Sequence, residues 1–441
     1  MTRIFFFLIG LSFLVTVNSV SGQLRVMTGY VGMREAQIWV GSDLEHDIIL
    51  RVGIKNSRAL QRLIPASIKS EDGMSCKITI DLLEPGTTYV YGLAYADPQL
   101  PADDRTYEFT TQPLWQWRND PPAFRLTTGS CAYVNETNYD RPGEPYGGDY
   151  SIYDSIAAKD PDLMLWLGDN IYLREVDFES MSAIQHRYNQ SRKLPEMQKL
   201  LTACPHVAIW DDHDFGPNDA NGSYIHKDLT LEAFRDYWCN PGSGIAGTCA
   251  ENGMATSFTF ADVDFFLLDN RFNRTGAGLK GNKTPTILGE DQLNWFLQAI
   301  AASRAPFKMV AVGGQFLNTE PYKENYSTYP IERQIILDFI DQNNIKGVIF
   351  LTGDRHCGEM SSLKLPSGNM VYDLTVSPLT SKSYDTSKEK NTLRIEKSTV
   401  ADRHYAVLDF SGPRKERKLN IRMIDVKGVT RFEHTIEVKT D

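Results

Sequence analysis

Two stretches of the chain place metal-binding residue types directly after apolar runs. Asp169 follows the run DLMLWLG, and Tyr172 comes three positions later. Asp354 and His356 follow the run VIFLTG two residues apart, so an extended backbone directs both side chains to the same side. A carboxylate can bridge two cations, imidazole binds transition metals, and a tyrosine phenolate suits ferric iron. These residue types at this spacing predict a centre for two or three metal ions.

Two further segments add possible ligands and a possible proton donor. The segment WDDHDFGPND (210–219) concentrates carboxylates, which repel one another unless cations or hydrogen bonds offset their charge. Within it, His213 has the chemistry to donate a proton to a leaving oxygen or to hydrogen-bond a phosphate. Cys131 ends the run FRLTTGSC and has the chemistry of a thiolate ligand.

Each of these motifs alone has a more ordinary interpretation. A Gly-Asp pair after a strand is usually a turn or a helix cap, and a cysteine there is more often core or disulfide. The acidic segment alone would suit a structural calcium site. The motifs taken together favour a catalytic site, because GD, DDHD and GDxH follow three apolar runs in that order.

The elements that must position these residues form an α/β pattern. Apolar strands are predicted at 124–131, 162–170, 206–214, 258–271, 308–316 and 347–356, with helices at 153–160, 287–303 and 332–344. Strands interleaved with helices indicate an α/β core. In such folds ligands bind at the carboxyl ends of the strands, where the polar residues stand. The polar stretch 382–402 is predicted to be a long surface loop.

The amino-terminal part of the chain has a different pattern. Residues 1–22 carry Arg3, an apolar run and then small residues, which predicts a secretory signal peptide rather than a membrane anchor. From 23 to 113, short alternating strands such as AQIWVG and TTYVYGLAYA predict a β-sandwich, in which Tyr89 or Tyr91 makes the corner hydrogen bond. A linker at 113–124 leads into a catalytic domain, 114–441.

The net charge and the cysteines limit which partners and which cellular compartment the sequence predicts. With a net charge of −10, the chain lacks the positive electrostatic field that attracts nucleic acid. Stable binding to nucleic acid is therefore not expected. No later stretch predicts a transmembrane anchor. A signal peptide implies a secreted protein, periplasmic or extracellular, where Cys239 and Cys249 are predicted to form a disulfide across a Pro/Gly-rich loop.

The order GSC, GDNIY, WDDHDFGPND and GDRH resembles the PhoD-like (alkaline phosphatase D) branch of the calcineurin-like metallophosphoesterases. The segments FFLLDNRFNR, ILGEDQLNWF and VYDLTVSPLTS extend the resemblance over nearly the whole mature chain. The resemblance implies a four-layered α/β/β/α core behind an immunoglobulin- or fibronectin-like sandwich. It also implies hydrolysis of phosphomonoesters and phosphodiesters with iron (Fe3+) and calcium (Ca2+), while zinc or another divalent metal stays open.

Carried over by position, the resemblance assigns metal ligands. Cys131, Asp169, Tyr172 and His356 would bind iron, whereas Asp169, Asp354 and Asn218 would hold calcium. In the mechanism that we hypothesise, the cations neutralise the phosphoryl oxygens and activate the attacking water.

Four other residues are predicted to be catalytic. His213 would assist the leaving group, with Asp212 beside it. Arg271 or Arg355 would clamp a phosphate oxygen.

Two other functions remain open at this point. One is a phosphodiesterase or phospholipase-like specificity. The choice between monoester and diester depends on the walls of the pocket, which would come from loops: 137–150, with Tyr139, Arg141 and Tyr146, 218–230 and 272–286. The other is a non-enzymatic calcium-binding adhesion or carbohydrate-binding protein, which would not explain the pairing of Asp354 with His356.

Overall fold

The computed structural model describes residues 23–57, 61–100, 103–242, 253–281, 284–322 and 324–439. The predicted signal segment, residues 1–22, lies outside this described part, as does Cys249 of the predicted disulfide. Both therefore stay predictions. Among the described residues, no helix has the length and apolar character needed to cross a membrane.

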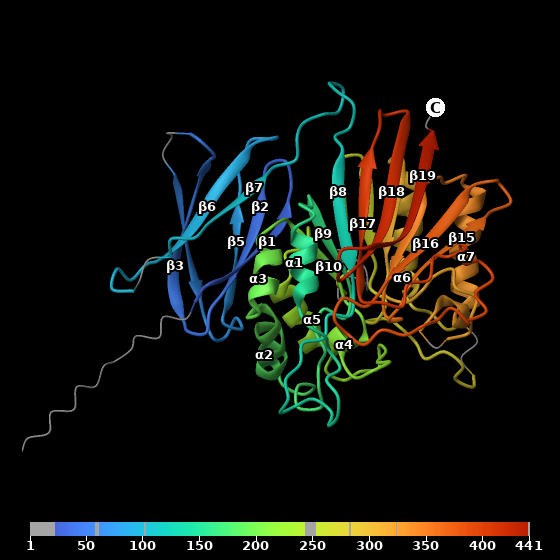
Figure 1. Ribbon diagram of the computed structural model, residues 1–441, viewed down its shortest axis with the longest axis horizontal. Helices are drawn as coiled ribbons and strands as arrows, with labels where there is room; N and C mark the ends of the chain where they lie inside the picture. Colours follow the sequence, from blue (N-terminus) through green and yellow to red (C-terminus); the bar gives the residue numbers. More distant parts are fainter. Residues whose placement is uncertain are drawn as a thin grey trace, which may run out of the picture.

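Antiparallel strands near the amino terminus form the predicted β-sandwich, at the left of Figure 1. One sheet contains β1 (Arg25–Val31), β2 (Ala36–Gly41) and β5 (Ser75–Ile80), and the other contains β4 (Arg62–Ile68), β3 (His46–Ile54), β6 (Thr88–Tyr95) and β7 (Thr106–Thr110). Side chains of both sheets, such as Ile38 and Leu50, share one apolar core. Alternation alone did not predict β1 and β4, and β4 carries Pro65 at a sheet edge, where proline is tolerated.

The predicted tyrosine corner of this sandwich is made by Tyr89. Its hydroxyl oxygen accepts a hydrogen bond from the backbone N–H of Glu84 at 2.8 Å. Tyr91 does something different, because its hydroxyl lies 2.9 Å from that of Thr28 in the buried interior. The corner fixes the turn before β6.

Two six-stranded sheets form the centre of the rest of the chain. The first runs in the order β10 (His206–Ile209), β9 (Leu163–Leu167), β8 (Phe124–Gly129), β17 (His404–Ser411), β18 (Glu416–Asp425), β19 (Thr430–Lys439). The second runs β11 (Thr256–Phe260), β12 (Val263–Leu267), β13 (Phe307–Ala311), β14 (Val348–Thr352), β16 (Met370–Val376), β15 (Gly358–Lys364). Strands β8, β9 and β10 are mutually parallel, as are β12, β13, β14 and β16.

Helices cover the outer faces of both sheets. They are α1 (Ser151–Ala157), α2 (Met181–Arg192), α3 (Pro195–Leu201), α4 (Asp212–Phe215), α5 (Lys227–Tyr237), α6 (Glu290–Ala302) and α7 (Pro330–Gln342), with a 3-10 turn at Tyr326–Thr328. Figure 1 shows α1, α2 and α3 between the sandwich and the first sheet, and α7 near β15 and β16.

The alternation of side chains along the second sheet explains the layers. In β12 and β13, Phe265 and Met309 face a core that is shared with the first sheet. Their neighbours Phe266 and Val310 face the opposite way, into a separate core that contains α6 and α7 residues. The fold is therefore the predicted α/β/β/α core with an amino-terminal sandwich.

The sandwich packs closely against the helical face of the first sheet. Trp39 on β2 is fully buried in the main core of the α/β region, with its ring 5.5 Å from that of Tyr237. Arg25 on β1 bonds Asp43 at 2.7 Å and Asn189 of α2 at 3.2 Å. The two parts thus share buried side chains.

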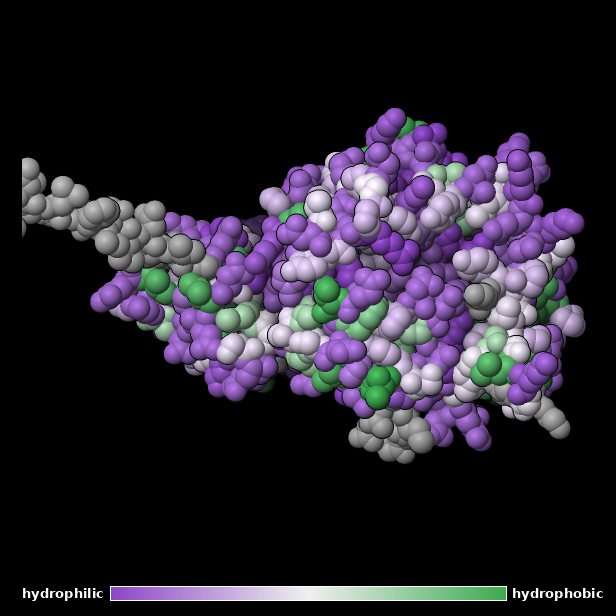
Figure 2. Space-filling view, turned by 90° about the horizontal axis from the view of Figure 1, so that it is seen from below, coloured by the Kyte–Doolittle hydropathy of each residue, from purple (hydrophilic) through white to green (hydrophobic). Residues whose placement is uncertain are grey.

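One face of the molecule is shown from below in Figure 2. Most of this face is hydrophilic, and hydrophobic side chains stand singly or in small groups among polar ones. Scattered apolar residues of this kind are normal on soluble surfaces. This face therefore offers no broad apolar area.

We expect Trp39→Ala to lower the free energy of unfolding by about 3–5 kcal/mol, because it leaves a cavity between the sandwich and the α/β core. Trp117→Ala is the matched control, since Trp117 is 91% exposed and its loss should change stability by less than about 0.5 kcal/mol. Urea unfolding of both variants measures the difference, and equal losses would contradict this role for Trp39.

Candidate metal centre

The predicted ligand residues come together where the parallel strands of both sheets end. Cys131 follows β8, Asp169 follows β9, and the acidic segment Asp211–Asp214 follows β10. From the second sheet, Asp354 and His356 follow β14. Because the sheets pack face to face, their carboxyl-terminal edges form one site.

The same unusual backbone conformation recurs at four residues of this site. Cys131, Asp169, Asp354 and His356 all have positive φ angles, of 61°, 51°, 64° and 53°. Non-glycine residues adopt this left-handed conformation rarely, and it costs free energy that the surroundings must offset. Gly168, with φ of 92°, makes the predicted turn before Asp169. The turns aim four ligand-type side chains inward.

One part of the site combines sulfur, nitrogen and oxygen donors. Cys131 Sγ lies 3.4 Å from Asp169 Oδ2, and the Tyr172 hydroxyl lies 3.1 Å from the same oxygen. The Tyr172 hydroxyl is also 3.2 Å from His356 Nε2. Donor atoms of Cys131, Asp169 and His356 all lie within 4.8 Å of one another. Such a mixed set suits a transition metal.

A second part of the site is made of carboxylates. Asp211, Asp212 and Asp354 form a group whose ligand oxygens lie within 4.8 Å of one another. One oxygen of each is buried and has no hydrogen-bond partner among the described residues. Buried carboxylate oxygens facing one another without donors fit a hard cation that takes oxygen ligands.

Two residues link the groups. Asp169 belongs both to the group with Cys131 and His356 and to a third group with Asp212 and His213. Asp212 in turn belongs to that third group and to the carboxylate group. Shared carboxylates are what adjacent cations need in order to lie close together.

The electrostatics of the protein alone disfavour the charged forms of several of these groups. Burial, and then the neighbouring carboxylates, raise the pKa of Asp169 and of Asp354 well above the usual value. Burial and Asp169 likewise raise the pKa of the Cys131 thiol. Without cations, these groups therefore favour their protonated forms.

Arg271 lies entirely within this acidic interior. Its guanidinium bonds Asp211 and, at 2.5 Å, Glu324, while Asp212 lies 3.6 Å away. Arg271 has no exposed surface. Its role as a phosphate clamp stays a prediction, and the contacts favour a role in holding Asp211 in place.

Arg355 is also engaged by protein groups. It pairs with Glu389, bonds Gln315 at 3.0 Å and lies 4.0 Å from the centre of the Tyr322 ring. Because a carboxylate already offsets its charge, its predicted clamping role likewise stays a prediction.

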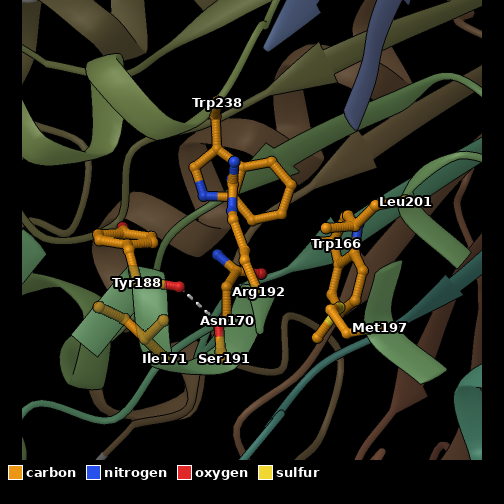
Figure 3. Close-up of a pocket in the computed structure, with 9 residues that line it drawn as sticks. All are labelled: Trp166, Asn170, Ile171, Tyr188, Ser191, Arg192, Met197, Leu201 and Trp238. Carbon is orange, nitrogen blue, oxygen red and sulfur yellow. Dashed lines mark hydrogen bonds between the residues drawn. The ribbon is translucent and has the colours of Figure 1, made fainter. Parts of the chain in front are cut away.

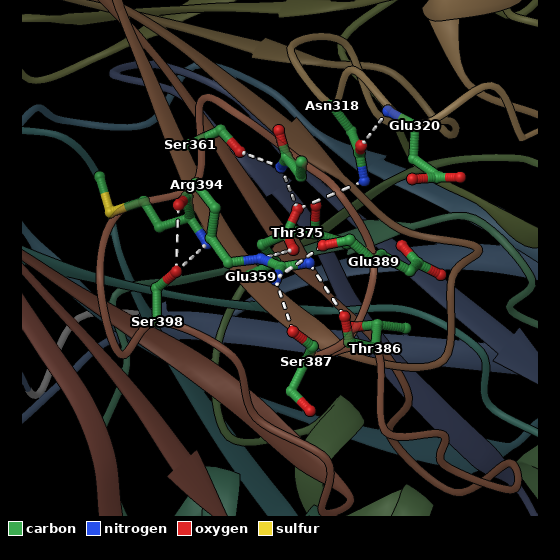
Figure 4. Close-up of polar contacts among 12 residues, drawn as sticks. Asn318, Glu320, Glu359, Ser361, Thr375, Thr386, Ser387, Glu389, Arg394 and Ser398 are labelled. Carbon is green, nitrogen blue, oxygen red and sulfur yellow. Dashed lines mark hydrogen bonds and ion pairs between the residues drawn. The ribbon is translucent and has the colours of Figure 1, made fainter.

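Glu389 belongs to the segment 382–402, which has no helix or strand and was predicted to be a surface loop. The loop is anchored at buried positions: Arg394 pairs with Glu359, whose carboxylate also accepts a hydrogen bond from Asn391 at 2.6 Å (Figure 4). The buried hydroxyl of Ser398 bonds Met360. The segment is thus a loop, but a tethered one.

Aromatic rings surround the histidines. His213 lies with its ring 4.2 Å from that of Tyr172, and its backbone N–H donates to Asp169 at 3.3 Å. Tyr146, from the loop 137–150, has its hydroxyl 3.2 Å from His356 Nδ1. Tyr384 stacks on His356 at 5.6 Å. The loop 137–150, which was predicted to form part of the wall of the substrate pocket, therefore contacts the site through Tyr146.

Some residues were placed differently from the sequence prediction, or were missed. Asn218 is exposed and makes no hydrogen bond to another described residue, so its predicted calcium ligation stays a prediction. Asp212 was assigned to catalysis, but its position suits metal binding equally. Glu324 and Tyr384 stand in no motif that marks them, and Asp211 was one of several acidic residues that the pattern does not distinguish.

Cys357, which directly follows His356, belongs to none of the three groups of potential ligands. It is buried, and the hydroxyl of Thr386 is the group that most lowers the pKa of its thiol, against the larger opposing effect of burial. Its place beside the GDRH motif therefore does not make it a member of the three ligand groups.

A comparison with protein families matches residues 126–415 to the PhoD-like phosphatase model. The chain belongs to the PhoD-like phosphatase family. The matched range contains every residue that lies in the three groups of potential metal ligands.

Two relatives of this PhoD-like chain extend the comparison. Alkaline phosphatase D of Bacillus subtilis (strain 168) is 26% identical over 263 residues, which are 49% of this chain and 45% of that protein. The chain thus matches less than half the length of this relative. A solved structure described as the structure of PhoD has a TM-score of 0.75 at 19% identity, covering 95% of this chain and 90% of that one. This structural likeness establishes the fold.

Metal uptake should depend on pH, because the raised pKa values leave Asp169, Asp354 and Cys131 protonated in the metal-free protein. Binding must then release protons, so affinity should rise as the pH rises. Calorimetric titration of chelator-treated protein with Zn2+ or Ca2+, in buffers of different ionisation enthalpy, measures both effects. Cys131→Ser should weaken Zn2+ binding by about 10-fold or more, and Cys357→Ser should not. An affinity independent of pH would contradict this account.

Removing Arg271 should destabilise the fold. We expect Arg271→Met to cost about 3–5 kcal/mol, because it leaves Asp211 buried without its cation and leaves Glu324 with Arg274 alone. Arg62→Met is the control: Arg62 forms an exposed pair with Asp81, and its loss should cost less than about 1 kcal/mol. Chemical unfolding compares the two, and a stable Arg271 variant would instead favour the clamp.

Proposed function

We propose that this chain is an exported, metal-dependent phosphoester hydrolase with alkaline phosphatase or phosphodiesterase activity. The observation that carries the proposal is that Asp211, Asp212 and Asp354, close to Cys131 and His356, each have a buried carboxylate oxygen without a hydrogen-bond partner among the described residues. Membership of a phosphatase family supports the reaction class. The predicted signal segment supports export.

The donor chemistry supports two kinds of cation in one centre. Cys131, Tyr172 and His356, with Asp169, would hold iron, and the oxygen-only group with Asp354 would hold calcium. Zinc or another divalent metal is the alternative for the first position. When bound, such cations neutralise phosphoryl charge and lower the pKa of a coordinated water.

The residues of the chain would orient the substrate around this centre. His213 lies against Tyr172 and beside Asp169, so its ring can reach a phosphoryl or leaving-group oxygen. Arg271 fixes Asp211 and Asp212 through its ion pairs. The substrate would be a small phosphomonoester or phosphodiester rather than a nucleic acid, because the chain is acidic.

Hydrolysis of p-nitrophenyl phosphate and of bis-p-nitrophenyl phosphate at alkaline pH, before and after chelation, tests the proposal. Elemental analysis of the same sample identifies the metals. Turnover that chelation abolishes is expected, and the ratio of the two rates distinguishes a monoesterase from a diesterase or phospholipase-like enzyme. No turnover with calcium alone bound would favour a calcium-binding adhesion or carbohydrate-binding protein.

Asp169→Asn should lower kcat/KM by more than about 100-fold and reduce the metal content, because Asp169 is shared between two ligand groups. Asp104→Asn is the control, since Asp104 is exposed and should leave both quantities unchanged. A variant with normal turnover and normal metal content would refute the assignment of Asp169.

A further inference from the structure

Arg355 brings a positive charge to the ligand turn after β14. It stands between Asp354 and His356 in the sequence, and its backbone N–H donates to the backbone oxygen of Gly353 at 2.7 Å. Burial lowers the pKa of His356 to about 4, and the charge of Arg355 contributes to the same shift. Arg355 therefore acts electrostatically on the centre, although it belongs to none of the groups of potential ligands.

The carboxylate of Glu389 pairs with this guanidinium and is the more exposed partner. The side chain of Glu389 is 26% exposed, whereas that of Arg355 is 4% exposed. The other contacts of the guanidinium are a hydrogen bond to Gln315 at 3.0 Å and the ring of Tyr322, whose centre is 4.0 Å away. Burial, and then the charge of Asp354, raise the pKa of Tyr322, so this ring also lies near the centre. A carboxylate that reaches solvent is thus attached to an arginine of the metal site.

The backbone of Glu389 is held in place by the tethered loop. Its N–H donates to the backbone oxygen of Thr386 at 3.0 Å, and its backbone oxygen accepts from Arg394 at 3.3 Å. Arg394 is itself paired with Glu359, which is 1% exposed (Figure 4). The negative charge of Glu389 is therefore fixed next to Arg355.

Phosphomonoesters and phosphodiesters differ in charge at alkaline pH. A monoester is a dianion, because its second proton leaves at a pKa of about 6, whereas a diester carries one negative charge. A fixed carboxylate beside the site therefore repels a monoester about twice as strongly as a diester. The same carboxylate also occupies a guanidinium whose geometry suits phosphoryl oxygens.

We propose that Glu389 is a specificity-determining residue, which biases the site toward monoanionic phosphodiesters by neutralising Arg355. Arg271 does not replace Arg355 in this respect, because it has no exposed surface and already pairs with Asp211 and Glu324. The inference rests on the proposed function, since it concerns the choice between two substrates of the same site.

Glu389→Gln tests the proposal, because it removes the charge and keeps an oxygen for Arg355. The quantity measured is the ratio of kcat/KM for p-nitrophenyl phosphate to kcat/KM for bis-p-nitrophenyl phosphate, two esters with the same leaving group. We expect this monoester-to-diester ratio to rise by about 10-fold, from the loss of one unit of charge near the phosphoryl group. Glu389→Asp keeps the charge and should retain the ratio of the unmodified protein.

Asp385→Asn is the matched control for the loss of a charge. Asp385 lies on the same loop, is exposed, and accepts a hydrogen bond from the backbone N–H of Ser387 at 2.9 Å. Its substitution should leave the ratio unchanged. The proposal would be overturned by an unchanged ratio in Glu389→Gln, or by an equal rise in Asp385→Asn or in Glu389→Asp.

Binding of inorganic phosphate provides a readout that does not need turnover. Calorimetric titration of the full chain, loaded with Zn2+ and Ca2+ and held at about pH 8.5, presents phosphate as a dianion. Phosphate should bind Glu389→Gln about 10-fold more tightly than the unmodified protein, and dimethyl phosphate should gain less. Equal phosphate affinity in the two proteins would overturn the proposal. If the unmodified protein hydrolyses neither ester, the proposed function fails, and the phosphate titration still decides the role of Glu389.

Discussion

Mutual repulsion among buried carboxylates is the constraint on which the rest of the site depends. Asp169, Asp211, Asp212 and Asp354 converge where water cannot screen them, and burial raises the pKa of three of them. Arg271 offsets part of this charge through Asp211, and Glu324 in turn offsets Arg271. The remaining carboxylates are the groups that, in the proposed function, would hold cations.

The strand ends hold these groups together against that repulsion. Left-handed backbone at Cys131, Asp169 and Asp354 is tolerated because each residue comes two positions after the end of a strand whose residues are buried or nearly so. Close approach adds to the rigidity: a Cβ on Gly313 would stand 2.2 Å from Asp211 Oδ2. The fold thus concentrates strain and charge at one edge, and the two large cores stabilise it.

Local sequence patterns predicted the sandwich, the α/β core and the residue types that gather at the site, whereas the four-layered arrangement was predicted from the family resemblance. Apolar runs that end in Gly-Asp are visible in one sequence, so Asp169, Asp354 and His356 were identified before their proximity was known. Contacts distant in sequence left no local signal. Glu324 pairs with Arg271 across 53 positions, and Tyr384 reaches His356 from a loop that polarity alone placed at the surface. The sequence pattern also cannot tell which of four neighbouring aspartates faces a cation.

The amino-terminal sandwich has a physical connection to the metal centre despite contributing no ligand. Trp39 covers the guanidinium of Arg192, for which the described residues provide no acidic partner, so aromatic rings stabilise its charge. Arg192 and Asn170, which is one residue from Asp169, line the same small pocket (Figure 3). A shift of β2 would move Trp39 and so disturb the aromatic rings that surround Arg192. The sandwich therefore contributes to the stability of the α/β core.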